Sequence, residues 1–139
     1  MTAKRIIWTN PDGSVSVLIP APGVPEHVWR KDIPQGVTPV ETDTDHLPRD
    51  RMFRSAWKAE GNGCVECPVK AKDVAHEIRR NKRAEEFAPY DEIVAKRIPG
   101  QEAQAEAARQ RIRDKYAQLQ TQIDAAQGVE DLRQLLRNA

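Results

Sequence analysis

A seven-residue apolar repeat in the last third of the chain limits the fold more than any other feature. Its members are Ala105, Ile112, Tyr116, Leu119, Ile123 and Ala126. Such spacing forms one seam along an α-helix that packs against a second helix. About three heptads are visible, near the lower limit for a coiled coil, and Arg109 occupies a core position in the first. We predict a helix over residues 101–127 that ends at Gly128. Its predicted partner-binding residues are Ile112, Tyr116, Leu119 and Ile123.

Helix-forming residues dominate the region after Pro68. Residues 69–87 carry a thin apolar stripe, formed by Ala71, Val74, Ala75 and Ile78. We expect Pro89 to interrupt this helix and to leave a second short helix over residues 90–97, before a further break at Pro99 and Gly100. A last amphipathic segment, Val129–Arg137, is able to fold back on the long helix. The helices therefore form either a helical hairpin within one chain or an oligomeric coiled coil.

The first 19 residues carry the clearest β-hairpin signal. Two runs rich in β-branched residues, 4–9 and 14–19, flank the turn sequence from Asn10 to Gly13. Alternation places Val15 and Val17 on one face. The second strand should be covered on both sides near its end, because Leu18 and Ile19 break that alternation.

Residues 20–48 are rich in proline and lack helical periodicity, so they are interpreted as an extended connector. Within it, residues 24–30 are compatible with one helical turn that starts at Pro25. Residues 37–40 are compatible with a short edge strand that ends before the acidic residues 41–45. The chain is thus predicted to be α+β, with a β-hairpin module, connector and turn over 1–68 and a helical region over 69–139.

Residues 50–58 concentrate aromatic and arginine side chains in a chain that has only 5% aromatic residues. Phe53, Ala56 and Trp57 have the spacing of one helix face, with Asp50 as N-cap, Gly61 and Gly63 as stop signals, and a strand over 64–67 following. Two interpretations are open. In one, Phe53 and Trp57 close a small core while Arg51 and Arg54 cap or pair with Asp45 and Asp50. In the other, the four residues anchor a protein partner, since Trp and Arg often dominate interface energy. The two interpretations are compatible with each other.

Composition narrows the function classes. Only 39% of the 139 residues are hydrophobic and the mean hydropathy is −0.71, which favours a thin or shared core. Twenty-two basic residues oppose 21 acidic ones, so net charge suggests neither a nucleic acid nor a membrane partner. We expect a soluble, unexported chain, because no apolar run approaches the roughly 20 residues of a membrane span.

The chain offers two weak candidates for site chemistry. Cys64 and Cys67 form a Cys-x-x-Cys pair without two further ligands at zinc-finger spacing, and reduced structural thiols are the preferred interpretation. The basic run on residues 76–83 comprises His76, Arg79, Arg80, Lys82 and Arg83. It is interpreted as a solvated, salt-bridged helix face, with Asp73 and Glu77 pairing to Arg80 and Glu86 to Lys82 and Arg83. A nucleic-acid face is the alternative.

Catalytic motifs are missing from the sequence: it has no G-x-S-x-G, phosphate-binding glycine loop or H-E-x-x-H. The acidic cluster Glu41, Asp43, Asp45 and Asp50 lacks the glycine and terminal glutamate of a calcium loop, and is interpreted as a solvated linker. We therefore expect no enzyme, no metal and no cofactor.

One string of residues resembles a known group of proteins. Residues 47–57, LPRDRMFRSAW, and more loosely residues 70–80 and the hairpin at 12–15, resemble small tailed-bacteriophage proteins encoded near tail and tail-fibre genes. Met52 stands where that group commonly has Thr, Ser55 where it commonly has Asn, and Cys64 and Cys67 flank the following strand.

The resemblance implies a non-enzymatic virion structural protein, a tail- or tail-fibre-associated adaptor that docks onto other phage structural proteins such as fibre or baseplate subunits. It would be located in the virion after assembly in the host cytoplasm, with homo-oligomerisation through the C-terminal helices as a further expectation. Two alternatives stay open: a tail or tail-fibre assembly chaperone that is absent from the mature particle, and a nucleic-acid-binding regulator.

Overall fold

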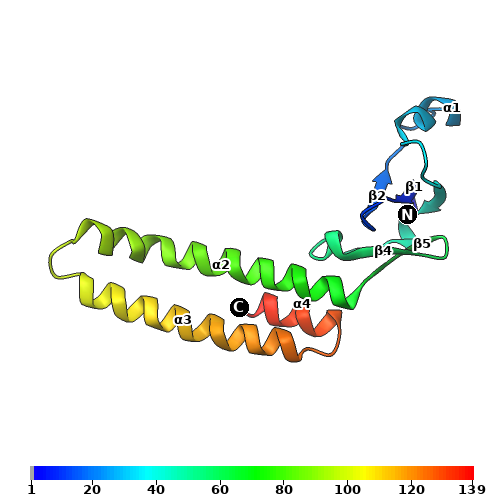
Figure 1. Ribbon diagram of the computed structural model, residues 1–139. Coiled ribbons are helices and arrows are strands. Elements are labelled where there is room, and N and C mark those ends of the chain that lie inside the picture. Colours follow the sequence, from blue (N-terminus) through cyan, green and yellow to red (C-terminus); the bar gives the residue numbers. More distant parts are fainter. Residues whose placement is uncertain (1) are drawn as a thin grey trace. The chain divides into compact units, whose positions relative to one another are not determined.

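The computed structural model describes residues 2–139, and the predicted α+β fold class is confirmed. The chain divides into two compact units, one ending at Ala71 and the other beginning at Lys72 (Figure 1). All strands lie in the first unit, and the second is helical. Each unit is described by itself.

A three-stranded antiparallel sheet with the order β2-β1-β3 is the centre of the first unit. The predicted hairpin is confirmed: β1 (Lys4–Thr9) pairs with β2 (Val15–Leu18). In the turn, the amide of Gly13 donates to the carbonyl of Asn10 at 2.9 Å, and Gly13 has a φ of 86°. Glycine adopts this left-handed conformation without steric cost, which is why the turn forms here.

Strand β3 spans Val40–Asp43, so the predicted edge strand at 37–40 was placed three residues too early. The acidic residues were expected to end the strand. They are accommodated because β3 lies beside the basic start of β1, with Lys4 opposite Asp43. The Nζ of Lys4 also lies 3.3 Å from a carboxylate oxygen of Glu41. Opposite charges on adjacent strands make the pairing favourable.

The central strand β1 is covered on both faces. One face forms a cluster of Ile7, Val15, Trp57 and Cys64, joined by Val17, Val40 and Leu47. The other face packs Ile6 and Trp8 against Trp29, joined by Leu18, Val24, Ile33 and Val37. Trp29 comes from the proline-rich connector, which forms the predicted short turn as helix α1 (Glu26–Trp29) and a 3-10 turn, Arg30–Asp32. The connector therefore supplies half of the small core.

The helix expected over residues 50–58 does not form. The structure has a 3-10 turn, Arg54–Ala56, followed by β4 (Trp57–Glu60), which pairs antiparallel with β5 (Gly63–Glu66). The spacing of Phe53, Ala56 and Trp57 does not reflect one face of a helix. A tight turn buries Phe53 and Ala56, and the next strand starts with a buried Trp57.

The two glycines expected to stop a helix belong to the β4–β5 hairpin. Gly61 has a φ of 59° in the two-residue connection, the position at which a type II′ turn needs glycine. At Gly63 the main chain lies against His46, and an added Cβ would clash with the carbonyl oxygen of His46. The Asp50 side chain caps a turn, accepting from the amide of Met52 at 2.8 Å.

The second unit contains α2, α3 (Glu102–Ala125) and α4 (Val129–Arg137). The predicted break at Pro89 was wrong, because α2 runs without interruption over Pro68–Lys96. A proline removes one hydrogen bond, to the carbonyl of residue 85 here, and both residues are exposed, so water can satisfy that carbonyl.

Helix α2 ends about two turns after Pro89 in a Schellman motif. The amide of Ile98 donates to the carbonyl of Ile93 at 3.5 Å, and that of Arg97, which has a φ of 49°, donates to the carbonyl of Val94 at 3.2 Å. Pro99 follows directly, so the helix cannot continue.

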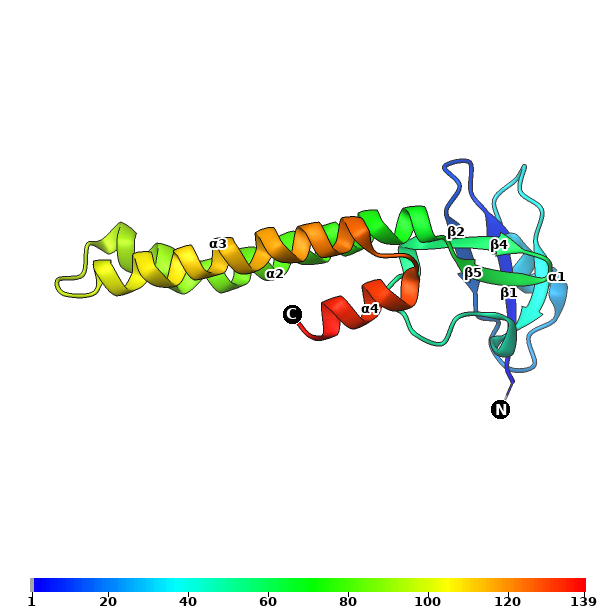
Figure 2. The ribbon, with the colours of Figure 1, turned by 90° about the horizontal axis from the view of Figure 1, so that it is seen from below.

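Helices α2 and α3 form an antiparallel hairpin, and α4 folds back against its open end, as Figures 1 and 2 both show. The predicted α3 and α4 are confirmed within one or two residues at each end. Of the two arrangements left open, the single chain adopts the helical hairpin.

Candidate functional site

The apolar seam of α3 is closed within one chain. Its residues Ile112, Tyr116, Leu119 and Ile123 are all buried, together with Ala105 and Ala108. These four predicted partner-binding residues therefore form the interior of the helical unit. Tyr116, Leu119 and Ile123 are closed to a partner while the hairpin is intact, whereas Ile112 also lines a hollow at the surface.

Tyr116 connects the seam to α2 through its hydroxyl group. The hydroxyl donates a hydrogen bond to the carboxylate of Glu86, and burial together with this carboxylate raises the pKa of Tyr116 well above its ordinary value. On the carboxylate side, the Tyr116 hydroxyl and the Nζ of Lys115, 3.1 Å away, lower the pKa of Glu86. The ion pair of Glu86 thus bridges two helices, in contrast to the predicted pairing with Lys82 and Arg83 along α2.

The basic run of α2 packs against the carboxyl-terminal ends of the other two helices. The Nζ of Lys82 donates to the carbonyl oxygen of Leu136 in α4 at 2.8 Å. Nearly three turns earlier in α2, the Nζ of Lys72 donates to the carbonyl oxygen of Asp124 in α3 at 2.9 Å. Cations at helix C-termini complement the helix dipole and satisfy carbonyls that lack intrahelical donors. Lys82 of the run and Lys72 before it thus cap two other helices, a role that neither predicted interpretation included.

A histidine in the same run extends this contact. The Nε2 of His76 lies 2.7 Å from the Oδ1 of Asp124, and the Nε of Arg79 donates to the Nδ1 of His76 at 3.3 Å. Arg79 is buried, whereas Arg80 is exposed on the opposite side of the helix.

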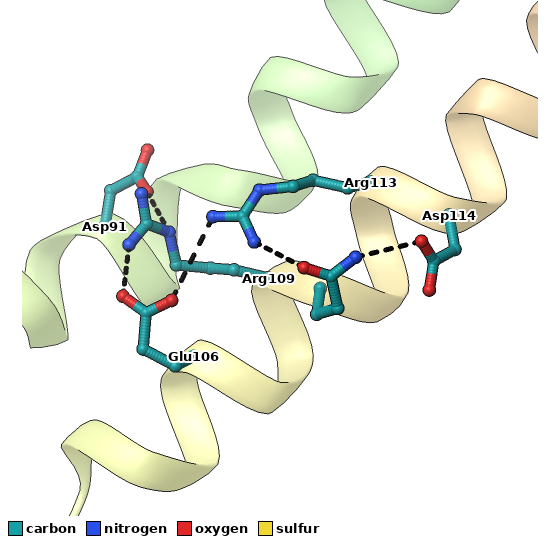
Figure 3. Close-up of polar contacts among 6 residues, drawn as sticks. Asp91, Glu106, Arg109, Arg113 and Asp114 are labelled. Carbon is teal, nitrogen blue, oxygen red and sulfur yellow. Dashed lines mark hydrogen bonds and ion pairs between the residues drawn. The ribbon is translucent and has the colours of Figure 1, made fainter.

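Arg109, at a core position of the heptad repeat, forms ion pairs with carboxylates from both helices (Figure 3). Its Nε lies 3.0 Å from the Oδ1 of Asp91 in α2, and its Nη1 lies 2.6 Å from the Oε1 of Glu106 in α3. Gln110 links Arg113 and Asp114 with hydrogen bonds of 2.9 Å each. A charged residue is tolerated at this position because the hairpin is only two helices thick there, and the side chain reaches the surface.

Helix α4 has nine residues and covers only one end of the α2–α3 hairpin. Beyond it lie two hollows of about 420 and 340 Å³. Tyr90, Ala108 and Arg111 line both hollows, so the two form one continuous groove, which we call the open groove. Its further lining includes Glu86, Pro89, Ile93, Ala105, Ile112 and Lys115. The sequence signals that could have indicated it are the alanines before Arg109 and the apolar residues after Pro89.

The arginine-aromatic segment is part of the core of the first unit. Phe53 is 0% exposed and Trp57 is 2% exposed. The guanidinium of Arg54 lies over the Trp57 ring, 4.5 Å from its centre, and Arg51 is exposed. The core interpretation is therefore what the structure shows. Of the four proposed anchor residues, the two aromatic side chains are not available on the surface.

The two cysteines are free and lie in different environments. Burial raises the pKa of the Cys64 thiol. Cys67 directly precedes α2, and the backbone amide of Lys70 in the first helical turn lowers the pKa of its thiol. Within residues 2–139, no three His, Cys, Asp or Glu side chains gather as a candidate metal site.

No helix in residues 2–139 combines the length and apolar character needed to cross a membrane. No protein-family model, no curated protein and no solved structure matches the chain.

Proposed function

We propose that this protein is a non-enzymatic structural adaptor of a tailed-phage particle, associated with the tail or the tail fibre. The resemblance of residues 47–57 suggests the particle. The helical unit suggests how an adaptor would act, and the observation that carries the proposal is the open groove beyond α4. A helical hairpin that buries its own seam and leaves such a groove is suited to receive a segment of a neighbouring subunit.

The contact surface that we propose is the groove around Tyr90, Ala108 and Arg111. It replaces Phe53, Trp57, Tyr116, Leu119 and Ile123, whose side chains are buried. Ala108 is a small residue on the floor, where a partner backbone could approach closely. A large charged side chain there would obstruct the groove.

The test is quantitative mass spectrometry of purified particles from phage that carry the wild-type gene or one of two variants. Wild-type protein is expected in the particle at a constant ratio to the major tail subunit. Ala108→Glu is expected to reduce that ratio at least tenfold. Gln120→Glu serves as the matched control, because Gln120 is exposed and lies nine residues, half a helical rotation, from Arg111.

Two outcomes would overturn the adaptor proposal. Wild-type protein that is absent from particles but forms a stable complex with a fibre subunit in lysates would instead support the assembly chaperone. Incorporation that is equal for all three proteins would show that the open groove is not the docking surface.

A further inference from the structure

The open groove continues the groove in which α4 is bound. On α2, Lys82 contacts the end of α4. Glu86, Pro89 and Ile93 follow at intervals of three and four residues, so they lie on the same face of α2 as Lys82, and they line the open groove. On α3, Gln122 lies beside Leu135 of α4.

The α3 side shows the same continuity. Lys115, Arg111 and Gln104 recur on the α3 face that carries Gln122, at intervals of seven or four residues, and all three line the open groove. The chain itself thus demonstrates which kind of ligand this surface accepts: one end of the groove already holds an amphipathic helix.

The remaining length suits a helix of about four turns. Beyond Lys82, α2 continues to Lys96, which corresponds to roughly 21 Å at 1.5 Å per residue. The floor contains the small buried residues Ala105 and Ala108, which allow a helix backbone to approach closely, and Ile112.

The charge of the groove indicates the chemistry of the occupant. Arg111 is exposed, lines both hollows, and has no ion-pair partner among residues 2–139. Lys115 is paired, with Glu86 at 3.1 Å. The unbalanced charge is therefore positive, and a carboxylate on the occupant would complement it. Helix α4 shows the apolar part of this combination, with leucines on one face, whereas its Glu130 and Asp131 are balanced by Arg133 and Arg137.

We infer that the open groove binds an acidic amphipathic helix from another protein, with a carboxylate of that helix paired to Arg111. This inference rests on the proposed adaptor function and specifies its partner. A different protein is favoured over a second copy of this chain, because α4 is already bound to its own hairpin and has no excess of acidic residues.

The experiment uses the full-length protein and two synthetic 14-residue helical peptides. Both carry the same leucine stripe, with glutamates along its flank in one peptide and lysines in the other. Binding is followed by amide chemical shifts and titration calorimetry at low salt. The acidic peptide is expected to shift the resonances of Tyr90, Ala108 and Arg111 in a saturable manner and to bind about tenfold more tightly than the basic peptide. Arg111→Glu should reverse this preference. Arg80→Glu, a matched exposed arginine outside the groove, should leave it unchanged.

Equal affinity for the two peptides, or shifts confined to other residues, would overturn the inference. So would a dimer in sedimentation equilibrium that Arg111→Glu dissociates, because a second copy would then be the occupant. Failure of this experiment is distinguishable from failure of the adaptor proposal. The protein can be present in particles without acidic-helix binding, and the acidic helix can bind to a protein that particles lack.

Discussion

The ammonium group of Lys82 in α2 donates a hydrogen bond of 2.8 Å to the carbonyl oxygen of Leu136, in the last turn of α4. Lys72 makes the equivalent contact with the C-terminal end of α3. The Lys82 contact gives a structural role to a lysine in a run that the sequence alone presents as a solvated or phosphate-binding surface. It also anchors a nine-residue helix, which is too short to be stable alone, on the hairpin.

The first prediction concerns this cap. Lys82→Met keeps the length of the side chain but removes the donor, and should lower the free energy of unfolding by about 1 kcal/mol. Hydrogen exchange of the amides in residues 129–137 should accelerate, because α4 loses an anchor. Urea unfolding and exchange mass spectrometry measure both effects. Arg80→Met, at an exposed position on the same helix, is the control, and equal exchange in the two variants would contradict the capping role.

The second prediction is an alkaline loss of stability that depends on Tyr116. The folded protein raises the pKa of Tyr116, whereas the unfolded chain has a tyrosine pKa near 10. The hydrogen bond to Glu86 therefore stabilises the fold fully below about pH 10, and its contribution decreases as the pH rises above that value. Urea midpoints measured from pH 8 to pH 11 should show this decrease in the wild type and in Tyr90→Phe, which retains Tyr116.

Tyr116→Phe should lack the Tyr116-dependent part of the decrease, because phenylalanine does not ionise. It should also be less stable at neutral pH by roughly 1 kcal/mol, since one interhelical hydrogen bond is lost. An alkaline profile parallel to that of the wild type would contradict the assignment.

The third prediction tests the close approach at Gly63. Gly63→Ala places a Cβ against the His46 carbonyl, so the backbone of the first unit must shift. The expected cost is about 2–3 kcal/mol, in the range of overpacked cores. Gly128→Ala has free space around the added Cβ and should cost less than about 1 kcal/mol. Thermal unfolding followed by circular dichroism compares the two, and a Gly63→Ala protein as stable as the wild type would exclude the contact.

The fourth prediction separates the two cysteines. Cys67 is partly exposed, and the amides of the first helical turn favour its thiolate. Cys64 is buried, and burial disfavours ionisation of its thiol. Iodoacetamide at pH 8 should therefore alkylate Cys67 much faster than Cys64, as read by peptide mass spectrometry over time. In urea the two rates should converge. Equal rates in the folded protein would show that the Cys64 environment opens readily.

Local sequence patterns were enough to predict those elements whose structure depends on residues close together in the chain. The turn from Asn10 to Gly13, the long helix α3 and the amphipathic α4 were all predicted, because turn geometry and helical periodicity are written in short stretches of chain. Leu18 was also expected to be covered, and it packs against the second face of the sheet.

The errors arose where distant contacts outweigh local signals. Pro89 signals a break, yet α2 continues because packing against α3 on both sides of the proline, at Glu86 and Asp91, outweighs one lost hydrogen bond. Residues 53–57 have helical spacing, yet they form a turn and a strand because Trp57 fills the core beside Ile7 and Val15.

The amino-acid sequence was enough to predict the α+β class, the position of most helices and the presence of an apolar seam. Three features emerge only in the folded chain: the seam is closed inside one chain, lysines of α2 cap two other helices, and Arg111 lines an open groove. The physical reason is the separation along the chain between the residues that interact. Periodicity and turn preferences act between residues a few positions apart, whereas burial, capping and charge balance depend on residues that folding brings together from more than 50 positions away along the chain, as for Lys82 and Leu136.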